Sequence, residues 1–318
     1  MSRQQTMLQY VKAYLKYRQE LGFELQSSQK LLPLFAKFVD RSGRSGPLTT
    51  DLILRWVHLP KKATRSYKAN RLSIVRGFAR YLAARDGQTE VPDWRLLPKV
   101  VNRRPYIFSE RQLQHLLTAT GRLKPSYPLR PLAYRTLFGL LAATGLRISE
   151  ALKLARGHVD LEQGILRIEK TKFKKSRLVP LHPTTTRALR RYAVARDRQW
   201  GQDGKNPFFV GRCGLALPYE TVKWAFEDLC RNLGWRPGNG EQPHPRIHDL
   251  RHSFACRCLL RWSRNGENVD QLIAALSTYL GHGRVTDTYW YLTGTPELLA
   301  IAGNRFERFT RRTKGVLS

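Results

Sequence analysis

The sequence predicts a mainly α-helical protein with a small antiparallel β-sheet, in which a helical first domain precedes a mixed α/β second domain. Three observations predict this fold class: apolar residues recur at helical spacing along most of the chain, two short β-type segments lie near its middle, and a stretch with little periodicity separates the two parts. The length of 318 residues fits two domains. We place the first domain at residues 1–90, a linker at 91–106 and the second domain at 107–318.

The first domain is expected to be built from helices. Apolar side chains recur at three- and four-residue intervals in two early segments, at Leu8, Val11, Tyr14 and Leu15 and again at Leu31, Leu34, Phe35 and Phe38. The turn-forming residues 42–50 follow, and Thr50 can cap a short helix that reaches Val57. A longer helix is expected from about Thr64 to Ala84.

This long helix and the turn before it carry many basic residues. Its apolar side chains would pack against the domain, at Tyr67, Leu72, Val75, Phe78 and Leu82. The remaining positions and the turn supply candidate phosphate contacts, at Lys61, Lys62, Arg65, Lys68 and Arg71. A solvated basic face, which any single helix can show, is the alternative.

The second domain begins with a helix at Ser109, which has the position of an N-cap, with Gln112 three residues on. An apolar helix is expected from about Leu132 to Ala143. Strands fit residues 164–169 and 176–181, so that the lysine-rich residues 170–175 form the tip of a hairpin, and residues 208–210 are expected to form a third strand. Further helices fit residues 183–198, 218–233, 246–262, 267–280 and 295–310.

The chain is strongly basic, with a formal net charge of +32 from 56 basic and 24 acidic residues. Residues 1–105 hold 21 basic and 7 acidic side chains and residues 106–318 hold 35 and 17, so the excess is not confined to a tail. A surface of this kind attracts a polyanion by neutralising phosphates and releasing counterions. The charge favours a nucleic acid as partner over an anionic membrane.

Several features indicate an intracellular protein. No run approaches the roughly 20 apolar residues of a membrane span, and the first residues lack the apolar centre of a signal peptide. Only four cysteines are present, too few for a disulfide scaffold, and Cys256 and Cys258 fit packing in a helix better than a metal site. With a nucleic acid as partner, we expect a cytoplasmic, nucleoid-associated protein without membrane contact.

The chemistry suggested by the residue types is the opening of a phosphodiester without metal. Such a reaction needs a nucleophile, cations on the non-bridging oxygens and an acid for the leaving oxygen. The sequence shows no cluster of carboxylates suited to magnesium and no Gly-rich phosphate loop ending in Lys-Ser or Lys-Thr. We therefore expect neither a metal nor another cofactor, and we expect Arg, Lys, His and Tyr to act.

Four segments carry these residue types: ATGLRISEALKL (143–154), TKFKKSRLVPL (171–181), HDLRHSFA (248–255) and LGHGRVTDTYWYL (280–292). Gly145 should end one helix and place Arg147 at the entry of the next. His248 and Arg251 share a helix face, and a zinc pair of His248 with His252 lacks a third ligand nearby. Each segment alone is also explained by a surface cation, a basic loop or a structural His or Tyr.

Together, in this order and spacing, the four segments resemble the tyrosine recombinase (phage integrase) family, in its simple two-domain form found in mobile elements or Xer-like proteins. The resemblance covers about residues 108–292, and the first hundred residues look more weakly like the family's core-binding domain. It implies a helical core-binding domain, a mixed α/β catalytic domain, and site-specific cleavage and rejoining of DNA through a 3′-phosphotyrosine intermediate, in the integration or transposition of a mobile element.

The resemblance also implies roles for single residues. Arg147 and Arg251 would clamp the scissile phosphate and Tyr291 would attack phosphorus. Lys172 would protonate the departing 5′ oxygen; it precedes RLVPL at the family's spacing, which favours it over Lys170, Lys174 and Lys175. His248 would act as general base or phosphate ligand, and His282 would hydrogen-bond a non-bridging oxygen. Glu150 would brace the first arginine. Apart from the resemblance, Lys174 and Lys175 at the basic hairpin tip are candidate DNA contacts.

The resemblance implies double-stranded DNA as partner and a homotetramer that brings two DNA sites together. The expected helix at 295–310 would dock on a neighbouring subunit, with packing on its own domain as the alternative. Accessory recombinases or DNA-bending proteins stay open. Two rival functions also stay open: a type IB topoisomerase-like DNA-relaxing enzyme, and a DNA-binding accessory protein that does not cut.

Overall fold

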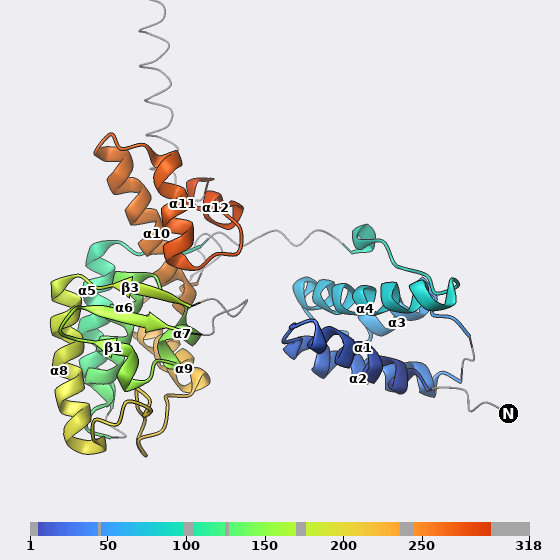
Figure 1. Ribbon diagram of the computed structural model, residues 1–318, viewed down its shortest axis with the longest axis horizontal. Coiled ribbons are helices and arrows are strands. Elements are labelled where there is room, and N and C mark those ends of the chain that lie inside the picture. The colour runs from blue at the N-terminus through green and yellow to red at the C-terminus, as the bar shows by residue number, and fades with distance from the viewer. Residues whose placement is uncertain are drawn as a thin grey trace, which may run out of the picture. The chain divides into compact units, whose positions relative to one another are not determined.

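The computed structural model describes residues 6–43, 46–97, 105–124, 127–169, 176–235 and 244–293 (Figure 1). The chain forms two compact units, Met1–Asn102 and Arg103–Ser318, and their boundary falls within the predicted linker. The predicted fold class is confirmed, because the described residues are mainly helical and contain a three-stranded antiparallel sheet. The expected hairpin tip at 170–175 and the expected helix at 295–310 lie outside the described residues.

The first unit contains four α-helices in its described part: α1 (Met7–Glu20), α2 (Gln26–Arg41), α3 (Thr50–His58) and α4 (Arg65–Asp86), followed by the short 3-10 helix η1 (Trp94–Leu96). Threonine side chains cap three of the helices, Thr6 for α1, Thr49 for α3 and Thr64 for α4. The prediction of Thr50 as the cap of α3 was wrong by one residue, because the Thr49 hydroxyl accepts the Leu52 amide.

The inner faces of these helices form one core. Phe35 lies edge-on to Trp56 and to Phe78, and all three rings are almost fully buried. Tyr67, which the spacing placed among the packing residues of α4, is instead 41% exposed. It lies in the first turn of the helix, outside the buried stretch that runs from Arg71 to Leu82.

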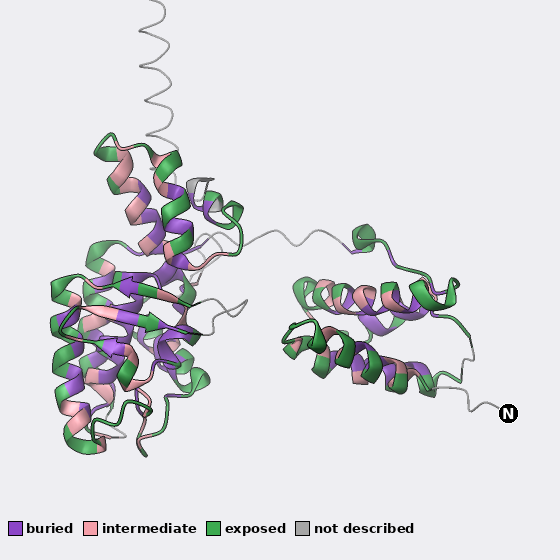
Figure 2. Cartoon of the chain, viewed as in Figure 1, coloured by how far each residue is buried: buried purple, intermediate pink, exposed green. Residues whose placement is uncertain are grey.

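The second unit begins with α5 (Glu110–Ala119), η2 (Thr120–Arg122), α6 (Arg130–Thr144), α7 (Ile148–Leu152) and η3 (Arg156–His158). The sheet follows, and after it come α8 (Pro183–Trp200), α9 (Tyr219–Asn232), α10 (Ile247–Arg264), α11 (Val269–Leu280) and α12 (Thr286–Thr293). Ser109 caps α5 in a capping box with Gln112, as predicted. The apolar helix α6 is buried along most of its length, and packs against α5, α8 and α10 (Figure 2).

The sheet has the order β1-β2-β3, formed by β1 (Val159–Asp160), β2 (Ile165–Ile168) and β3 (Arg177–Pro180). All pairs are antiparallel, and Arg167 in β2 faces Leu178 in β3. The prediction of a third strand at 208–210 was wrong: Val159 and Asp160 supply it. Phe208 and Phe209 are instead core residues that pack on Tyr192, and Val210 forms only an isolated bridge to Ala216.

Two clusters of buried side chains support this unit. The larger one joins α5 to α9 and the sheet, and the smaller one lies among α10, α11 and α12 and contains Tyr291. None of the four cysteines forms a disulfide; Cys256 is buried and Cys258 half-buried in α10. Among the described residues, no helix combines the length and the apolar composition needed to cross a membrane.

Candidate active site

Arg147 stands at the start of α7, where the sequence places a helix break. Gly145 ends α6 with a φ of +63°, a conformation that favours glycine. A Cβ atom there would also lie 2.5 Å from the ring of Phe254. The chain therefore turns at this glycine, and Arg147 follows as the residue that precedes α7.

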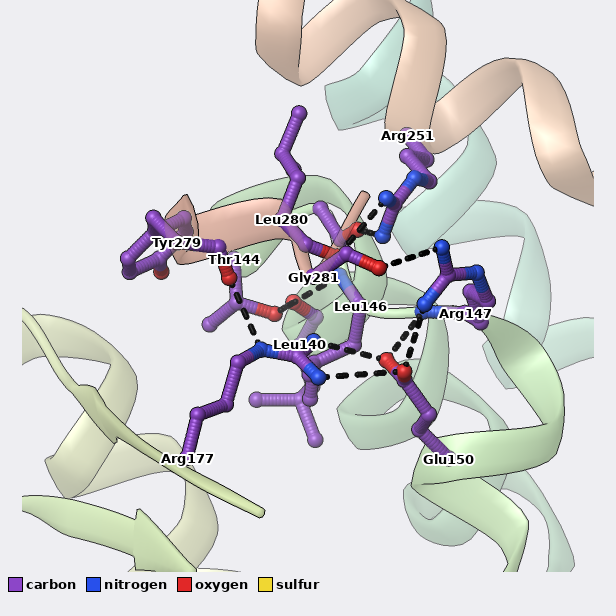
Figure 3. Close-up of polar contacts among 11 residues, drawn as sticks. Leu140, Thr144, Leu146, Arg147, Glu150, Arg177, Arg251, Tyr279, Leu280 and Gly281 are labelled. Carbon is purple, nitrogen blue, oxygen red and sulfur yellow. Dashed lines mark hydrogen bonds and ion pairs between the residues drawn. The ribbon is translucent and has the colours of Figure 1, made fainter. Parts of the chain in front are cut away.

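The Arg147 side chain is held from two sides, as Figure 3 shows. Its Nη1 donates to Oε1 of Glu150 over 2.9 Å, and its Nη2 donates to the carbonyl oxygen of Gly281 over 2.8 Å. Its backbone amide donates to Oε2 of Glu150 over 3.0 Å. With 25% of the side chain exposed, the guanidinium is oriented by protein atoms and still meets solvent.

Glu150 is a buried carboxylate shared by two arginines. Besides Arg147, it accepts hydrogen bonds from Arg177 of β3, over 3.1 Å from Nη1 and 2.9 Å from Nη2. Burial by itself would raise the pKa of this carboxyl, but the hydrogen bonds and charges of Arg177 and Arg147 outweigh it and hold the pKa below its usual range. Glu150 is therefore ionised at neutral pH.

Arg251 lies in α10 and is 2% exposed. Its Nη1 donates to the carbonyl oxygen of Gly145 over 2.7 Å and its Nη2 to that of Leu280 over 2.8 Å. Burial and the nearby charge of Arg147 lower its pKa to about 10, so the guanidinium stays charged at neutral pH. This arginine thus links the turn before α7 to the end of α11.

Two of the predicted histidines lie close to these arginines. His248 keeps an exposed edge, yet desolvation by the surrounding protein and the charges of Arg251, Arg246 and Arg147 lower its pKa to about 4. His282 follows the glycine that ends α11, and a 2.7 Å hydrogen bond joins its Nδ1 to Oγ1 of Thr288. Burial and the charges of Arg251 and Arg147 lower its pKa to about 4. Both imidazoles are neutral at pH 7.

Tyr291 lies in α12 and is 3% exposed. Its ring stacks near that of His282, with 6.1 Å between centroids, and meets that of His252 edge-on at 5.4 Å. Burial raises the pKa of the phenol, although a hydrogen bond with Arg251 and the positive charges of Arg251 and Arg147 partly oppose this. The phenol is therefore protonated at neutral pH and already points to a guanidinium.

The structure thus brings six of the predicted residues to one place in the second unit, and these are Arg147, Glu150, His248, Arg251, His282 and Tyr291. They come from the turn before α7, from α7, α10 and α12, and from the loop after α11. Their individual roles stay predictions. The predicted lysines Lys172, Lys174 and Lys175 lie outside the described residues.

The predicted DNA contacts of the first unit have different surroundings. Lys61, Lys62 and Arg65 are exposed and Lys68 is half-buried, so these cations can reach a ligand. Arg71 was predicted wrongly. It is 6% exposed, its Nη2 donates to the carbonyl oxygen of Trp56 over 2.6 Å, and its guanidinium lies 3.4 Å from the centroid of the Trp56 ring. This arginine is part of the core.

Sequence reasoning missed two residues of the site. Arg177 was part of a quoted segment but, as a lone Arg in a strand, it had no spacing that distinguished it. His252 was considered only as a zinc ligand; its ring lies 4.6 Å from that of His248 and against Tyr291. Among the described residues, no group of three or more His, Cys, Asp or Glu is arranged to hold a metal ion.

Comparison with known proteins identifies relatives over most of the chain. Residues 107–297 match the model of the phage integrase family. A Sinorhizobium fredii protein, y4rB, described as an integrase/recombinase, is 41% identical over 95% of this chain and 98% of its own length. The tyrosine recombinase XerC of Azotobacter vinelandii is 31% identical over 81% of this chain and 79% of its own length.

Solved structures share the fold. The Tn1549 transposon integrase, in complex with transposon right end DNA, has a TM-score of 0.69 and 16% identity over 96% of this chain and all of that chain. The XerH site-specific recombinase bound to its difH substrate has a TM-score of 0.64 and 19% identity over 87% of this chain and 78% of that chain. The chain belongs to the phage integrase family and is a site-specific tyrosine recombinase that acts on DNA.

Proposed function

We propose that this recombinase breaks and rejoins duplex DNA with Tyr291 as nucleophile, through a 3′-phosphotyrosine link that conserves the energy of the broken bond. The position of the Tyr291 phenol carries the proposal. The phenol hydrogen-bonds the buried Arg251, and the positive charge of Arg147 and two neutral histidines lie nearby. A buried tyrosine beside a buried arginine is costly as mere packing, and is useful where an anionic phosphorus centre must be attacked.

In the proposed reaction, the phenolic oxygen of Tyr291 forms a bond to phosphorus while the bond from phosphorus to the 5′ oxygen breaks. The planar guanidinium groups of Arg147 and Arg251 bind the non-bridging oxygens and offset the charge that grows on them. Because burial raises the pKa of the phenol, Tyr291 is protonated before DNA binds, and its proton must pass to an acceptor when the bond to phosphorus forms. Rejoining is the same reaction in reverse, with the 5′ hydroxyl as nucleophile.

The proton transfers require an acceptor and a donor. His248 and His282 are neutral at pH 7, since their pKa values lie at about 4, so each has one ring nitrogen that can accept and one that can donate. We assign His248 as general base or phosphate ligand and His282 as hydrogen-bond donor to a non-bridging oxygen. Lys172 remains the proposed acid for the 5′ oxygen, on the family resemblance alone.

A suicide substrate tests this proposal. A nicked duplex that carries the recombination site loses the short strand after cleavage, which traps the covalent adduct for detection on a denaturing gel. The wild-type protein should form the adduct, and mass spectrometry should find the DNA on the peptide with Tyr291. Tyr291→Phe should bind the duplex with unchanged affinity and form no adduct; an adduct at the wild-type rate would remove Tyr291 as nucleophile.

For assembly, we propose a homotetramer on two DNA sites, in which residues 295–310 contact a neighbouring subunit. A lambda integrase tetramer bound to a Holliday junction shares the fold, with a TM-score of 0.61 and 17% identity, and supports this proposal. Mass photometry with site DNA should show four protomers on two duplexes. Protomers that stay monomeric on DNA and relax supercoiled plasmid without sequence preference would favour the topoisomerase-like alternative, and a covalent adduct excludes the non-cutting accessory protein.

We propose that the DNA backbone is contacted by six basic residues, Lys61, Lys62, Arg65, Lys68, Lys174 and Lys175. The exposure of the first three favours this role. Each phosphate contact that is lost should reduce the slope of log affinity against log salt concentration by about 0.9. With DNA as its substrate, we place the protein in the cytoplasm with the nucleoid.

A further inference from the structure

The end of α11 binds three arginines at once. Three consecutive backbone carbonyls each accept a hydrogen bond of 2.8 Å from a different arginine: Tyr279 from Arg177, Leu280 from Arg251 and Gly281 from Arg147 (Figure 3). The last carbonyls of a helix have no partner within it and carry partial negative charge. The guanidinium groups therefore supply hydrogen-bond donors to the carbonyl oxygens at the end of α11, and these carbonyls in turn orient the guanidinium groups.

Arg177 differs from the other two arginines in how its donors are used. Its Nε donates to Tyr279, and its two terminal nitrogens donate to the two oxygens of Glu150 in a fork-to-fork pair. Its side chain is 14% exposed, against 25% for that of Arg147. All three nitrogens of the Arg177 guanidinium thus donate to protein atoms, which fits a role in supporting the site.

Charge gives a reason for a second arginine at Glu150. A carboxylate that paired with Arg147 alone would neutralise the cation that the scissile phosphate needs. With Arg177 on the same carboxylate, two positive charges share one negative charge, and the group keeps a net charge of +1. The carboxylate can then hold Arg147 in place while a phosphate still meets a cation.

Steric contact ties the two arginines together as well. A Cβ atom at Gly281 would lie 2.8 Å from Nη1 of Arg177 and 3.5 Å from Nη1 of Arg147. Both guanidinium groups therefore pack against the same glycine, which has a φ of +69°. A displacement of Arg177 removes support from Glu150 and from this glycine, and both of these hold Arg147.

We infer that Arg177 is a positioning residue for Arg147, acting through Glu150 and through the carbonyl groups at the end of α11. The inference rests on the proposed function, since it concerns how the first arginine meets the scissile phosphate. It assigns a role in phosphate recognition to a strand residue that does not touch the phosphate.

The test compares cleavage of two suicide duplexes that differ at the scissile position. One carries the ordinary phosphodiester, and the other carries a methylphosphonate, in which a methyl group replaces a non-bridging oxygen and removes the negative charge. An arginine that neutralises this charge is less needed on the neutral substrate. The factor by which Arg147→Met slows cleavage should therefore be smaller for the methylphosphonate than for the phosphodiester. If Arg177 acts through Arg147, the factor by which Arg177→Met slows cleavage should also be smaller for the methylphosphonate.

We expect Arg177→Met to slow single-turnover cleavage of the phosphodiester on the order of 100-fold and that of the methylphosphonate less than about 10-fold. Arg177→Lys, which keeps the charge but loses the fork, should show a smaller loss with the same preference, and it serves if the Met variant does not fold. Arg167→Met is the matched control, since Arg167 is exposed in β2 opposite Leu178. It should cleave both substrates like the wild type.

The outcomes separate this inference from the proposed function. Wild-type protein that forms no adduct with the phosphodiester would remove the proposed function, and the inference with it. A wild-type adduct combined with equal losses on both substrates for the Arg177 variants would show a merely structural role. If the folded Arg177→Met variant cleaves the phosphodiester at the wild-type rate, the inference is likewise overturned, while the proposed function still holds.

Discussion

Replacing Glu150 by glutamine tests whether this carboxylate organises the site. Each of its oxygens accepts two hydrogen bonds: Oε1 from the Nη1 atoms of Arg147 and Arg177, and Oε2 from the Arg147 amide and from Nη2 of Arg177. In Glu150→Gln, either orientation of the amide turns one of these acceptors into a donor, which then faces two donors. The change in volume is negligible, so packing does not account for the effect.

The magnitude follows from the two hydrogen bonds that are lost. Hydrogen bonds with charged partners contribute about 1.5–3 kcal/mol each, and removal of one partner of a buried ion pair costs about 3–5 kcal/mol. We expect a loss of about 3 kcal/mol in the free energy of unfolding of the second unit. For a unit of this size, about 1 kcal/mol shifts the melting temperature by about 2–4 °C, so the transition should fall by about 6–12 °C.

The same substitution should slow cleavage by roughly 100-fold, which corresponds to about 2.7 kcal/mol of transition-state stabilisation, because Arg147 loses its support. The assays are differential scanning calorimetry of the full chain and single-turnover cleavage of a suicide duplex. Glu162→Gln is the control, since it makes the same change of charge at an exposed position after β1. Melting within about 2 °C of this control, together with wild-type cleavage, would refute the role of Glu150.

The pKa of Glu150 also predicts how this difference depends on pH. Its pKa is lowered on folding, so its stabilisation is complete above the ordinary carboxyl pKa of about 4.3 and is lost as the pH falls through the lower folded value. The difference between the melting temperatures of wild type and Glu150→Gln should therefore be constant from pH 7 to about pH 5 and shrink below about pH 4.

Three further predictions concern other parts of the chain. Folding lowers the pKa of His252 to about 3 and that of His282 to about 4. Between these values and the ordinary histidine pKa of about 6.5, the unfolded chain therefore binds more protons than the folded chain. The melting temperature should accordingly fall as the pH falls through that range. Gly281→Ala should lower both stability and cleavage, because its Cβ atom would lie only 2.8 Å from Nη1 of Arg177. Gly87→Ala, at a φ of +63° with no atom within 4 Å of its Cβ, should cost only about 1–2 kcal/mol of backbone strain, seen in thermal melts. Arg71→Met should destabilise the first unit by about 2 kcal/mol in urea unfolding, through the lost hydrogen bond and ring contact.

Each of these predictions has a result that contradicts it. A melting temperature that is flat from pH 7 to pH 5 would contradict the first prediction, and a fall in His252→Asn equal to that of the wild type would rule out His252 as a cause. Equal losses for Gly281→Ala and Gly87→Ala would mean that strain alone acts at the first glycine. If Arg71→Met leaves the stability unchanged but reduces the salt dependence of DNA binding, Arg71 contacts DNA and does not stabilise the core.

Local patterns were sufficient where the outcome depends on neighbouring residues. The helix break at Gly145, the capping box of Ser109 with Gln112 and the antiparallel pair of β2 and β3 all follow from near-neighbour chemistry, and the structure confirms them. The segment 208–210 shows the limit: a continuous apolar run suits either a strand or a buried loop. Only the position of the Tyr192 ring decides between them.

The sequence by itself determined the helical periodicity, the basic character and four segments whose order identified the family, because these are properties of composition and spacing. Only the tertiary structure decided which cations stay exposed and which are held by other groups of the protein. Arg71 and Arg177 look like any other arginine along the chain, yet one lies against Trp56 in a core and the other shares Glu150 with Arg147. The physical reason is that the role of a guanidinium depends on the partners that folding brings within hydrogen-bond distance, and those partners are distant in sequence.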